Sequence, residues 1–355
     1  MQHLFAFHHN TGSLPKHHPY SSLSRVHRRS PNFIPCAAPP DVFVLDYDGV
    51  IADSALEVGT AGLNAAQKRW PSIFSSLPSD HSRRILQGLT LARPRLVKGY
   101  ESMVMARLMV ELGIDTAVSD ILHKGWEGPG PDGGLLHSTL QRWGETEDDL
   151  LPVFESFRSQ RLEEDVDAWV ALNPPYKGVV DALSDCAMPV YFCSSKRGDR
   201  LVRLLNAQLS LSPALDEYSP RVFSSMIPPN EKKIQALREI MERPVGRDAA
   251  ATTLHFIDDR YETIEAILKT ADDVASRYCL YLAGWGYNTE EERAAVAGLP
   301  GGVKVLTLPQ FCELLRFGIV MEVNDGCQDT EDEALDSVYK PFPGGRDGVG
   351  GSGKG

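Results

Sequence analysis

Four apolar residues near the start of the chain, followed at once by acidic residues, constrain the fold most. Residues 42–45 read Val-Phe-Val-Leu, and Asp46-Tyr47-Asp48-Gly49 comes next. A strand that is apolar on both sides is typical of a parallel sheet whose two faces are covered by helices. The next apolar segment of this kind begins only at residue 188, after about 120 mostly helical residues. The first strand must therefore pair with strands much later in the chain.

The remaining chain divides into a helical stretch and an alternating stretch. Helical spacing of apolar residues predicts helices over 55–70 and 100–112, inside a mostly helical region that ends near residue 172. Beyond it, strands are expected at 188–193, 221–224, 254–257 and 279–283, and helices at 178–183, 200–209, 231–241 and 263–270. Alternating strands and helices imply a doubly wound parallel sheet. The sequence therefore predicts an α/β core (41–56 and 172–320) with a mostly α-helical domain inserted at 57–171.

The two ends of the chain differ in composition from the rest. Residues 1–40 contain four Lys or Arg residues and no Asp or Glu, and they are rich in Ser, Thr and His. This composition is typical of an organelle transit peptide, and its hydroxyl residues favour a chloroplast, with the stroma as destination. A disordered cytosolic arm is the alternative. Residues 321–355 turn acidic and then Gly-rich, which predicts a disordered tail.

Charge and cysteine content argue against several classes of partner. The net charge is −12, and it becomes −16 without the four positive charges of residues 1–40. So acidic a protein does not attract nucleic acid or anionic membranes by its overall field. No apolar run approaches the ~20 residues that a transmembrane helix needs. The six cysteines are scattered and form no CxxC pair, so neither a zinc site nor a disulfide framework is expected.

Polar side chains follow the predicted strands at the points where those strands end. In an open α/β sheet, ligands bind beyond the carboxyl ends of the strands. Carboxylates, hydroxyls and a lysine are the groups that phosphoryl transfer through an aspartyl-phosphate requires. The residues at these strand ends and at the following helix start are Asp46, Asp48, Ser194, Ser195, Lys232, Lys233, Asp258 and Asp259.

The order of these residues resembles the haloacid dehalogenase-like hydrolase superfamily, in its phosphoglycolate phosphatase and β-phosphoglucomutase branch. Its DxDG(T/V) motif is matched by residues 46–50, and its second motif by the strand that ends in Ser194. A lysine at a helix start and the pair Asp258-Asp259 match the third and fourth motifs, although the family more often has Gly-Asp in the fourth. The resemblance covers about residues 42–58 and 174–320 and implies that the inserted domain is a cap over the site.

The resemblance also implies roles for these residues. Asp46 would be the nucleophile and Asp48 the general acid and base. Ser194, Ser195 and a lysine would hold the phosphate; Lys233 is favoured over Lys232 because it stands four residues before Leu237, which matches the family's spacing. Mg²⁺ would be held by Asp46, the backbone carbonyl of Asp48, Asp259 and Asp258. Glu262 is a further candidate near the metal.

These roles predict a Mg²⁺-dependent phosphatase that acts on a small phosphorylated metabolite. The second aspartate argues against halide displacement, since the halide-displacing members of the superfamily lack it. A phosphomutase and a non-catalytic assembly or regulatory protein are the alternatives. The cationic stretch 93–98 of the cap holds candidates for contacting the substrate, Arg93, Arg95 and Lys98, although a solvated cluster is the simpler interpretation. The substrate and the oligomeric state are left open.

Overall fold

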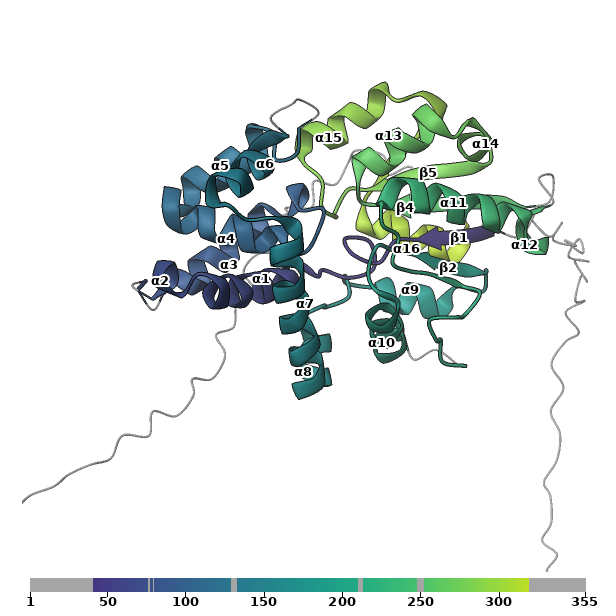
Figure 1. The fold of residues 1–355 in the computed structure, drawn as a ribbon. Helices are drawn as coiled ribbons and strands as arrows, with labels where there is room; N and C mark the ends of the chain where they lie inside the picture. Colours follow the sequence, from purple (N-terminus) through teal and green to yellow (C-terminus); the bar gives the residue numbers. More distant parts are fainter. Residues whose placement is uncertain are drawn as a thin grey trace, which may run out of the picture. The chain divides into compact units, whose positions relative to one another are not determined.

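The computed structural model describes residues 41–75, 77–78, 80–128, 133–209, 213–247 and 252–318. The predicted transit peptide (1–40) and tail (321–355) lie outside these residues. The described chain contains a six-stranded sheet in the order β3-β2-β1-β4-β5-β6, with every neighbouring pair parallel (Figure 1). The strands are β1 (Asp41–Leu45), β2 (Val190–Cys193), β3 (Val222–Phe223), β4 (Thr253–Asp258), β5 (Tyr278–Ala283) and β6 (Lys304–Leu306).

The strand β1 lies in the middle of the sheet, between β2 and β4, and its side chains enter two separate hydrophobic clusters. Phe43 and Leu45 belong to one cluster, and Val42 and Val44 belong to the other. This alternation follows from the period of two in a strand. All four side chains are fully buried, which explains why the segment has no polar residue.

Helices supply the other half of each cluster. The Phe43 cluster includes residues of α9 (Val179–Asp185), α10 (Gly198–Leu209) and α16 (Leu308–Phe317). The Val42 cluster includes residues of α11 (Pro229–Glu242), α13 (Tyr261–Thr270) and α14 (Asp272–Ala275). The short helices α12 (Pro244–Arg247), α15 (Glu290–Ala295), η2 (Val296–Gly298) and η3 (Pro300–Gly302) complete this part. A parallel sheet with helices on both faces confirms the predicted α/β class.

A run of helices is inserted between β1 and β2, as predicted, and we call residues 55–171 the cap. Its elements are α1 (Ala55–Arg69), α2 (Pro71–Phe74), α3 (His81–Leu91), η1 (Arg93–Arg95), α4 (Glu101–Leu112), α5 (Ile114–His123), α6 (Gly134–Trp143), α7 (Glu147–Glu164) and α8 (Val166–Ala171). Most of them contribute to a third hydrophobic cluster, separate from those of the sheet. The chain leaves the sheet and returns to it at one place, where the N–H of Asp53 donates to the carbonyl of Pro174 over 2.9 Å.

Strand and helix positions agree with the sequence to within two residues at every predicted end. The strand β6 was not predicted. It has only three residues, lies at the edge of the sheet, and leaves Lys304 and Val305 exposed. A segment this short with a polar start gives no apolar run by which it would be recognised.

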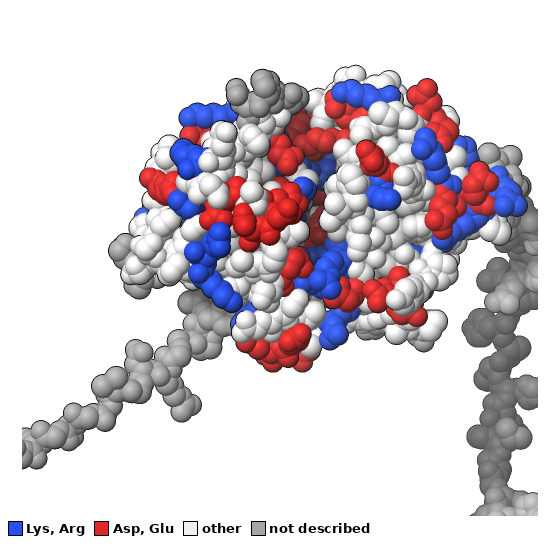
Figure 2. Space-filling model, in the orientation of Figure 1, with Lys and Arg blue, Asp and Glu red and all other residues white. Residues whose placement is uncertain are grey.

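The surface of the described chain carries charges of both signs. Figure 2 shows Lys and Arg side chains interspersed with Asp and Glu over the face in view. No helix among the described residues is long and apolar enough to cross a membrane.

Candidate active site

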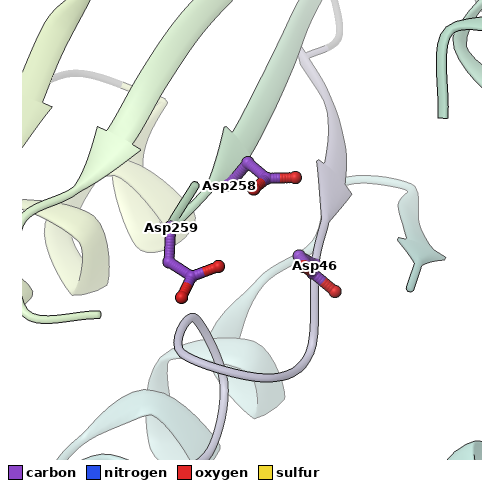
Figure 3. A group of neighbouring side chains, drawn as sticks. All are labelled: Asp46, Asp258 and Asp259. Atoms are coloured by element: carbon purple, nitrogen blue, oxygen red, sulfur yellow. The ribbon is translucent and has the colours of Figure 1, made fainter. Parts of the chain in front are cut away.

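Three aspartates meet where two neighbouring strands end. Asp46 follows β1, while Asp258 and Asp259 stand at the end of β4, and these strands are paired in register (Figure 3). Each of the three offers a carboxylate oxygen, and these oxygens lie within 4.8 Å of one another. All three side chains are buried. The sheet topology thus gathers the first and the last predicted motif at one point.

Lys233 lies between two of these aspartates. Its Nζ donates to Asp46 Oδ2 over 2.7 Å and to Asp258 Oδ2 over 2.5 Å. Lys232 is exposed, and its Nζ donates to Gln235 Oε1 of its own helix over 3.4 Å. Burial by itself lowers the pKa of Lys233, but the charges of Asp258 and Asp46 raise it above its ordinary value, so the side chain is a cation. Of the two candidate lysines, the structure brings Lys233 to the aspartates.

The two adjacent lysines form a matched pair for mutagenesis. We expect Lys233→Met to lower kcat/KM for phosphate release by roughly 100- to 1,000-fold, because a buried cation beside the reacting oxygens stabilises charge in the transition state. Lys232→Met should leave it within about twofold, as is usual for surface substitutions. Initial rates on one phosphate monoester test this prediction. Equal effects of the two substitutions would contradict it.

Negative charge at the aspartate cluster exceeds the positive charge of Lys233. Burial, together with the charges of Asp258 and Asp46, raises the pKa of Asp259 to about 7. Burial also raises the pKa of Asp46, although the nearby Lys233 works in the opposite direction. Buried carboxylates that repel one another are stabilised by a further cation. The donor set is all oxygen, which is the kind that Mg²⁺ prefers.

A tight turn brings Asp48 beside Asp46. The carbonyl of Tyr47 accepts bonds from the N–H groups of Ile51 and Ala52, and Gly49 has a φ of 78°. A Cβ at Gly49 would lie 2.1 Å from Asp259 Oδ2, so both the turn and the space require glycine here.

Asp48 is paired with a lysine that directly follows Ser194 and Ser195 at the predicted strand end but to which the sequence assigned no role. Lys196 Nζ lies 3.1 Å from Asp48 Oδ1, and both side chains are largely buried. Burial by itself would raise the pKa of Asp48, but the charges of Lys196 and Arg93 lower it below its ordinary value. Asp48 is therefore a carboxylate in the free protein.

A cavity of about 320 Å³ opens over these residues. Asp46, Asp48, Lys233, Asp259 and Ser195 line it. Ser194 is fully buried at the end of β2, where its Oγ accepts the N–H of Lys196 over 3.4 Å, and it is not part of the lining. Asp258 also lies behind the lining and accepts the backbone N–H of Arg260 over 2.9 Å. Of the two predicted serines, the structure thus places Ser195 and not Ser194 at the cavity.

Tyr287 lines the cavity and is another site residue that the sequence did not single out. Its backbone N–H donates to Asp259 Oδ2 over 2.8 Å, and its hydroxyl donates to Asp53 Oδ1 over 2.7 Å. Its neighbours Trp285 and Asn288 follow the same strand β5. They bond to backbone carbonyls of the core and are not part of the lining. In the sequence, Tyr287 was marked as a possible site residue only by its position after the last long strand.

The three candidate cations of the cap have different surroundings in the structure. Arg93 lines the cavity, with its guanidinium 3.9 Å from the ring centre of Tyr287. Arg95 forms an ion pair with Glu292, and Lys98 forms one with Glu147. Only Arg93, among these three, faces the aspartates.

Two residues that follow Asp259 also reach the cavity. Arg260 donates from Nη1 to the carbonyl of Pro94 over 2.8 Å, so it contacts the cap rather than remaining a surface residue. Glu262 lines the cavity and lies 3.4 Å from Arg260 Nε, but it does not belong to the aspartate cluster.

Comparisons with known proteins give only distant likenesses. No family model matches the chain, and no curated protein matches it. Its fold is similar to a solved structure described as a predicted phosphatase from Clostridium acetobutylicum, at 14% identity and a TM-score of 0.44, over 78% of this chain and 98% of that one. A haloacid dehalogenase family hydrolase from Deinococcus radiodurans, solved with bound phosphate and sodium, gives 16% identity and a TM-score of 0.41, over 78% and 95%. A haloacid dehalogenase-like family protein from Streptococcus pneumoniae gives 12% and 0.41, over 75% and 93%. Likeness at this level leaves the family open, and the function is inferred below from the residues of the site.

Proposed function

We propose that this protein is a Mg²⁺-dependent phosphatase that hydrolyses a small phosphate monoester through an aspartyl-phosphate on Asp46. The observation that carries the proposal is the arrangement of two carboxylates and a lysine at one cavity. Asp46 has one carboxylate oxygen held by the N–H of Tyr47 at 2.6 Å and the other held by Lys233 at 2.7 Å. Asp48 lines the same cavity two residues further on.

The first step is attack of a carboxylate oxygen of Asp46 on phosphorus. A bond from Asp46 to phosphorus forms as the bond from phosphorus to the leaving oxygen breaks, and Asp48 protonates that oxygen. A phosphate dianion beside Asp48 favours the protonated form of its carboxyl, which provides the proton. In the second step, water attacks phosphorus, Asp48 accepts the water's proton, and Asp46 is released as a carboxylate.

The aspartate cluster fits a divalent cation. The residues that would hold Mg²⁺ are Asp46, Asp259 and the backbone carbonyl of Asp48, with Asp258 nearby and already bonded to Lys233. When bound, Mg²⁺ would supply positive charge that offsets the repulsion between a phosphate dianion and these carboxylates.

Phosphate release from a panel of phosphorylated metabolites tests the proposal directly. We expect at least one member to be hydrolysed with Mg²⁺ present, and we expect EDTA to abolish the activity and Mg²⁺ to restore it. An isomerised sugar phosphate without free phosphate would indicate a mutase instead. Absence of any release across the panel would contradict a phosphatase.

The surroundings of Arg93 indicate which chemical group the substrate carries in addition to its phosphate. Within the described chain, its guanidinium forms no ion pair with a carboxylate. Its Nη1 donates to the carbonyl of Leu96 over 3.1 Å, and its Nε is buried without a hydrogen-bond partner. The other two cations that line the cavity are each paired with a carboxylate, Lys233 with Asp46 and Arg260 with Glu262. We therefore propose that Arg93 binds a second anionic group, such as a carboxylate, on the organic part of the substrate.

Replacing Arg93 tests this assignment. Arg93→Met should raise KM for a doubly anionic monoester by roughly 10- to 100-fold, the usual worth of a charge-assisted hydrogen bond. The loss should be much smaller with p-nitrophenyl phosphate, which has no second anion. Lys124→Met serves as the control because this exposed lysine of the cap pairs with Asp120 and does not line the cavity. Equal losses on both substrates would contradict the assignment.

A further inference from the structure

A buried carboxylate in the cap, Glu101, has no place in the reaction described above. Its side chain is fully inaccessible, and no Lys, Arg or His of the described chain forms an ion pair with it. Three N–H groups donate to it over 3.0 Å each: the backbone N–H of Val97, that of Lys98, and the indole of Trp126. A carboxylate buried without a cation is costly, and burial raises the pKa of Glu101 to about 7. A buried carboxylate of this kind is expected to have a structural or functional role.

Capping of the first turn of α4 does not explain this burial. Glu101 is the first residue of α4, and no side-chain capping bond to that turn is formed. Its carboxylate instead reaches back, as the Glu of a capping box does, to backbone N–H groups that lie before the helix, those of Val97 and Lys98. The carboxylate therefore fixes the path of the preceding segment.

That segment, residues 93–98, is the part of the cap that reaches the cavity, and we call it the cap loop. Arg93, Leu96 and Val97 line the cavity. Its first half is held from the core, because Arg260 donates to the carbonyls of Pro94 (2.8 Å) and Leu96 (3.3 Å). Its second half is held by the bonds to Glu101. The cap loop is thus held at two places. Arg260 of the core holds its first part, and Glu101 of the cap holds its last part.

We propose that Glu101 is a positioning residue that holds the cap loop in the conformation that presents Arg93 and Val97 to the substrate. The inference rests on the proposed function for its effect on catalysis, whereas the anchoring of the loop is independent of it. Three bonds converge on one carboxylate, and two of them come from consecutive backbone N–H groups of the loop. Loss of this acceptor leaves those N–H groups buried without a partner or lets the loop move.

Three substitutions remove these hydrogen bonds in different combinations. Glu101→Ala removes it for all three donors. Glu101→Gln keeps the shape but turns an NH₂ group toward at least one of the N–H donors. Trp126→Phe removes only the indole donor and leaves both backbone bonds. The control is Ile85→Ala, since Ile85 is fully buried in the same hydrophobic cluster of the cap and its side chain makes no hydrogen bond.

Hydrogen exchange at the backbone amides of Val97 and Lys98 provides the first measurement. We expect exchange to be about 10-fold faster or more in Glu101→Ala, with an intermediate increase in Glu101→Gln, because each lost buried hydrogen bond is worth about a factor of ten. Trp126→Phe and Ile85→Ala should leave these two amides close to wild type. Unchanged exchange in folded Glu101→Ala and Glu101→Gln proteins would overturn the proposal, whatever the protein's activity.

Steady-state kinetics provides the second measurement, on a substrate found in the phosphometabolite panel. Glu101→Gln should raise KM about 10-fold while kcat changes less, because the loop contacts the substrate and not the reacting oxygens. Ile85→Ala controls for general destabilisation of the cap. Equal KM values in Glu101→Gln and Ile85→Ala would overturn the role in substrate binding. If the wild-type chain releases no phosphate at all, the proposed function fails, and hydrogen exchange alone then decides whether Glu101 anchors the loop.

Discussion

Replacing Asp46 by Asn is expected to lower phosphate release by roughly 1,000-fold or more, because an amide cannot form the acyl phosphate. The substitution keeps the shape of the side chain. Lys233 retains its bond to Asp258, so the local structure should survive. Initial rates with Mg²⁺ on any hydrolysed monoester measure the effect.

The same substitution is expected to leave the protein about as stable as wild type when Mg²⁺ is absent, because the loss of a buried charge offsets the loss of a hydrogen bond from either Tyr47 N–H or Lys233 Nζ, toward which the NH₂ group of Asn turns. Burial and the charges of Asp258 and Asp48 raise the pKa of Asp46, so its negative charge costs free energy in the folded state. Asn removes that charge, and thermal unfolding in EDTA measures the result. A loss of activity without a loss of stability separates a catalytic role from a structural one. Undiminished, Mg²⁺-dependent activity in Asp46→Asn would contradict the nucleophile assignment.

Most strands of the sheet could be predicted because the apolar run that marks a buried strand lies within a few consecutive residues. A central strand covered on both faces, such as β1, has only apolar residues, and its neighbours β2, β4 and β5 carry enough of the same signal to be recognised. The edge strand β6 lacks that signal, since exposed residues are free to be polar. The other edge strand, β3, was predicted because it retains two apolar residues, Val222 and Phe223.

The approach of the aspartates and of one lysine to each other could also be predicted from local patterns in the sequence. Parallel strands that are neighbours end at one edge, so Asp46 and the pair Asp258-Asp259 had to meet. Adjacent residues on a helix point about 100° apart, so only one of Lys232 and Lys233 was able to face that edge. The spacing to Leu237 favoured Lys233, and the structure brings that residue to Asp46.

The remaining contacts of the site depend on side chains that reach across long stretches of sequence. Arg260 contacts Pro94 at a separation of 166 residues, and Tyr287 contacts Asp53 at a separation of 234. Lys196, beside Asp48, sits in a turn whose composition resembles any polar loop. Glu101 stands in a sequence typical of an exposed helix start. In each case the tertiary packing, which local pattern does not encode, determines the role.

Replacing Asp48 by Asn is expected to lower steady-state turnover of alkyl phosphate monoesters by roughly 100- to 10,000-fold, the usual worth of a general acid or base. The two halves of the reaction should respond differently. The first half needs a proton only when the leaving oxygen is a strongly basic alkoxide. The second half needs a base for water with every substrate. Leaving-group basicity therefore separates the two uses of Asp48.

With p-nitrophenyl phosphate, whose leaving group departs without a proton, Asp48→Asn should release a burst of about one p-nitrophenolate per protein and then turn over slowly. An alkyl ester should give no burst. The burst also shows that Asp46, Lys233 and the phosphate site remain intact, even though Lys196 has lost the partner that lies 3.1 Å away in the native protein. Rapid mixing with acid quench should recover the phosphate bound to the protein during the burst. Loss of the burst in a folded protein, or normal turnover of the alkyl ester, would show that Asp48 is not the proton carrier. In that case the Lys196–Asp48 pair would serve to shape the turn around Gly49 and not to move protons.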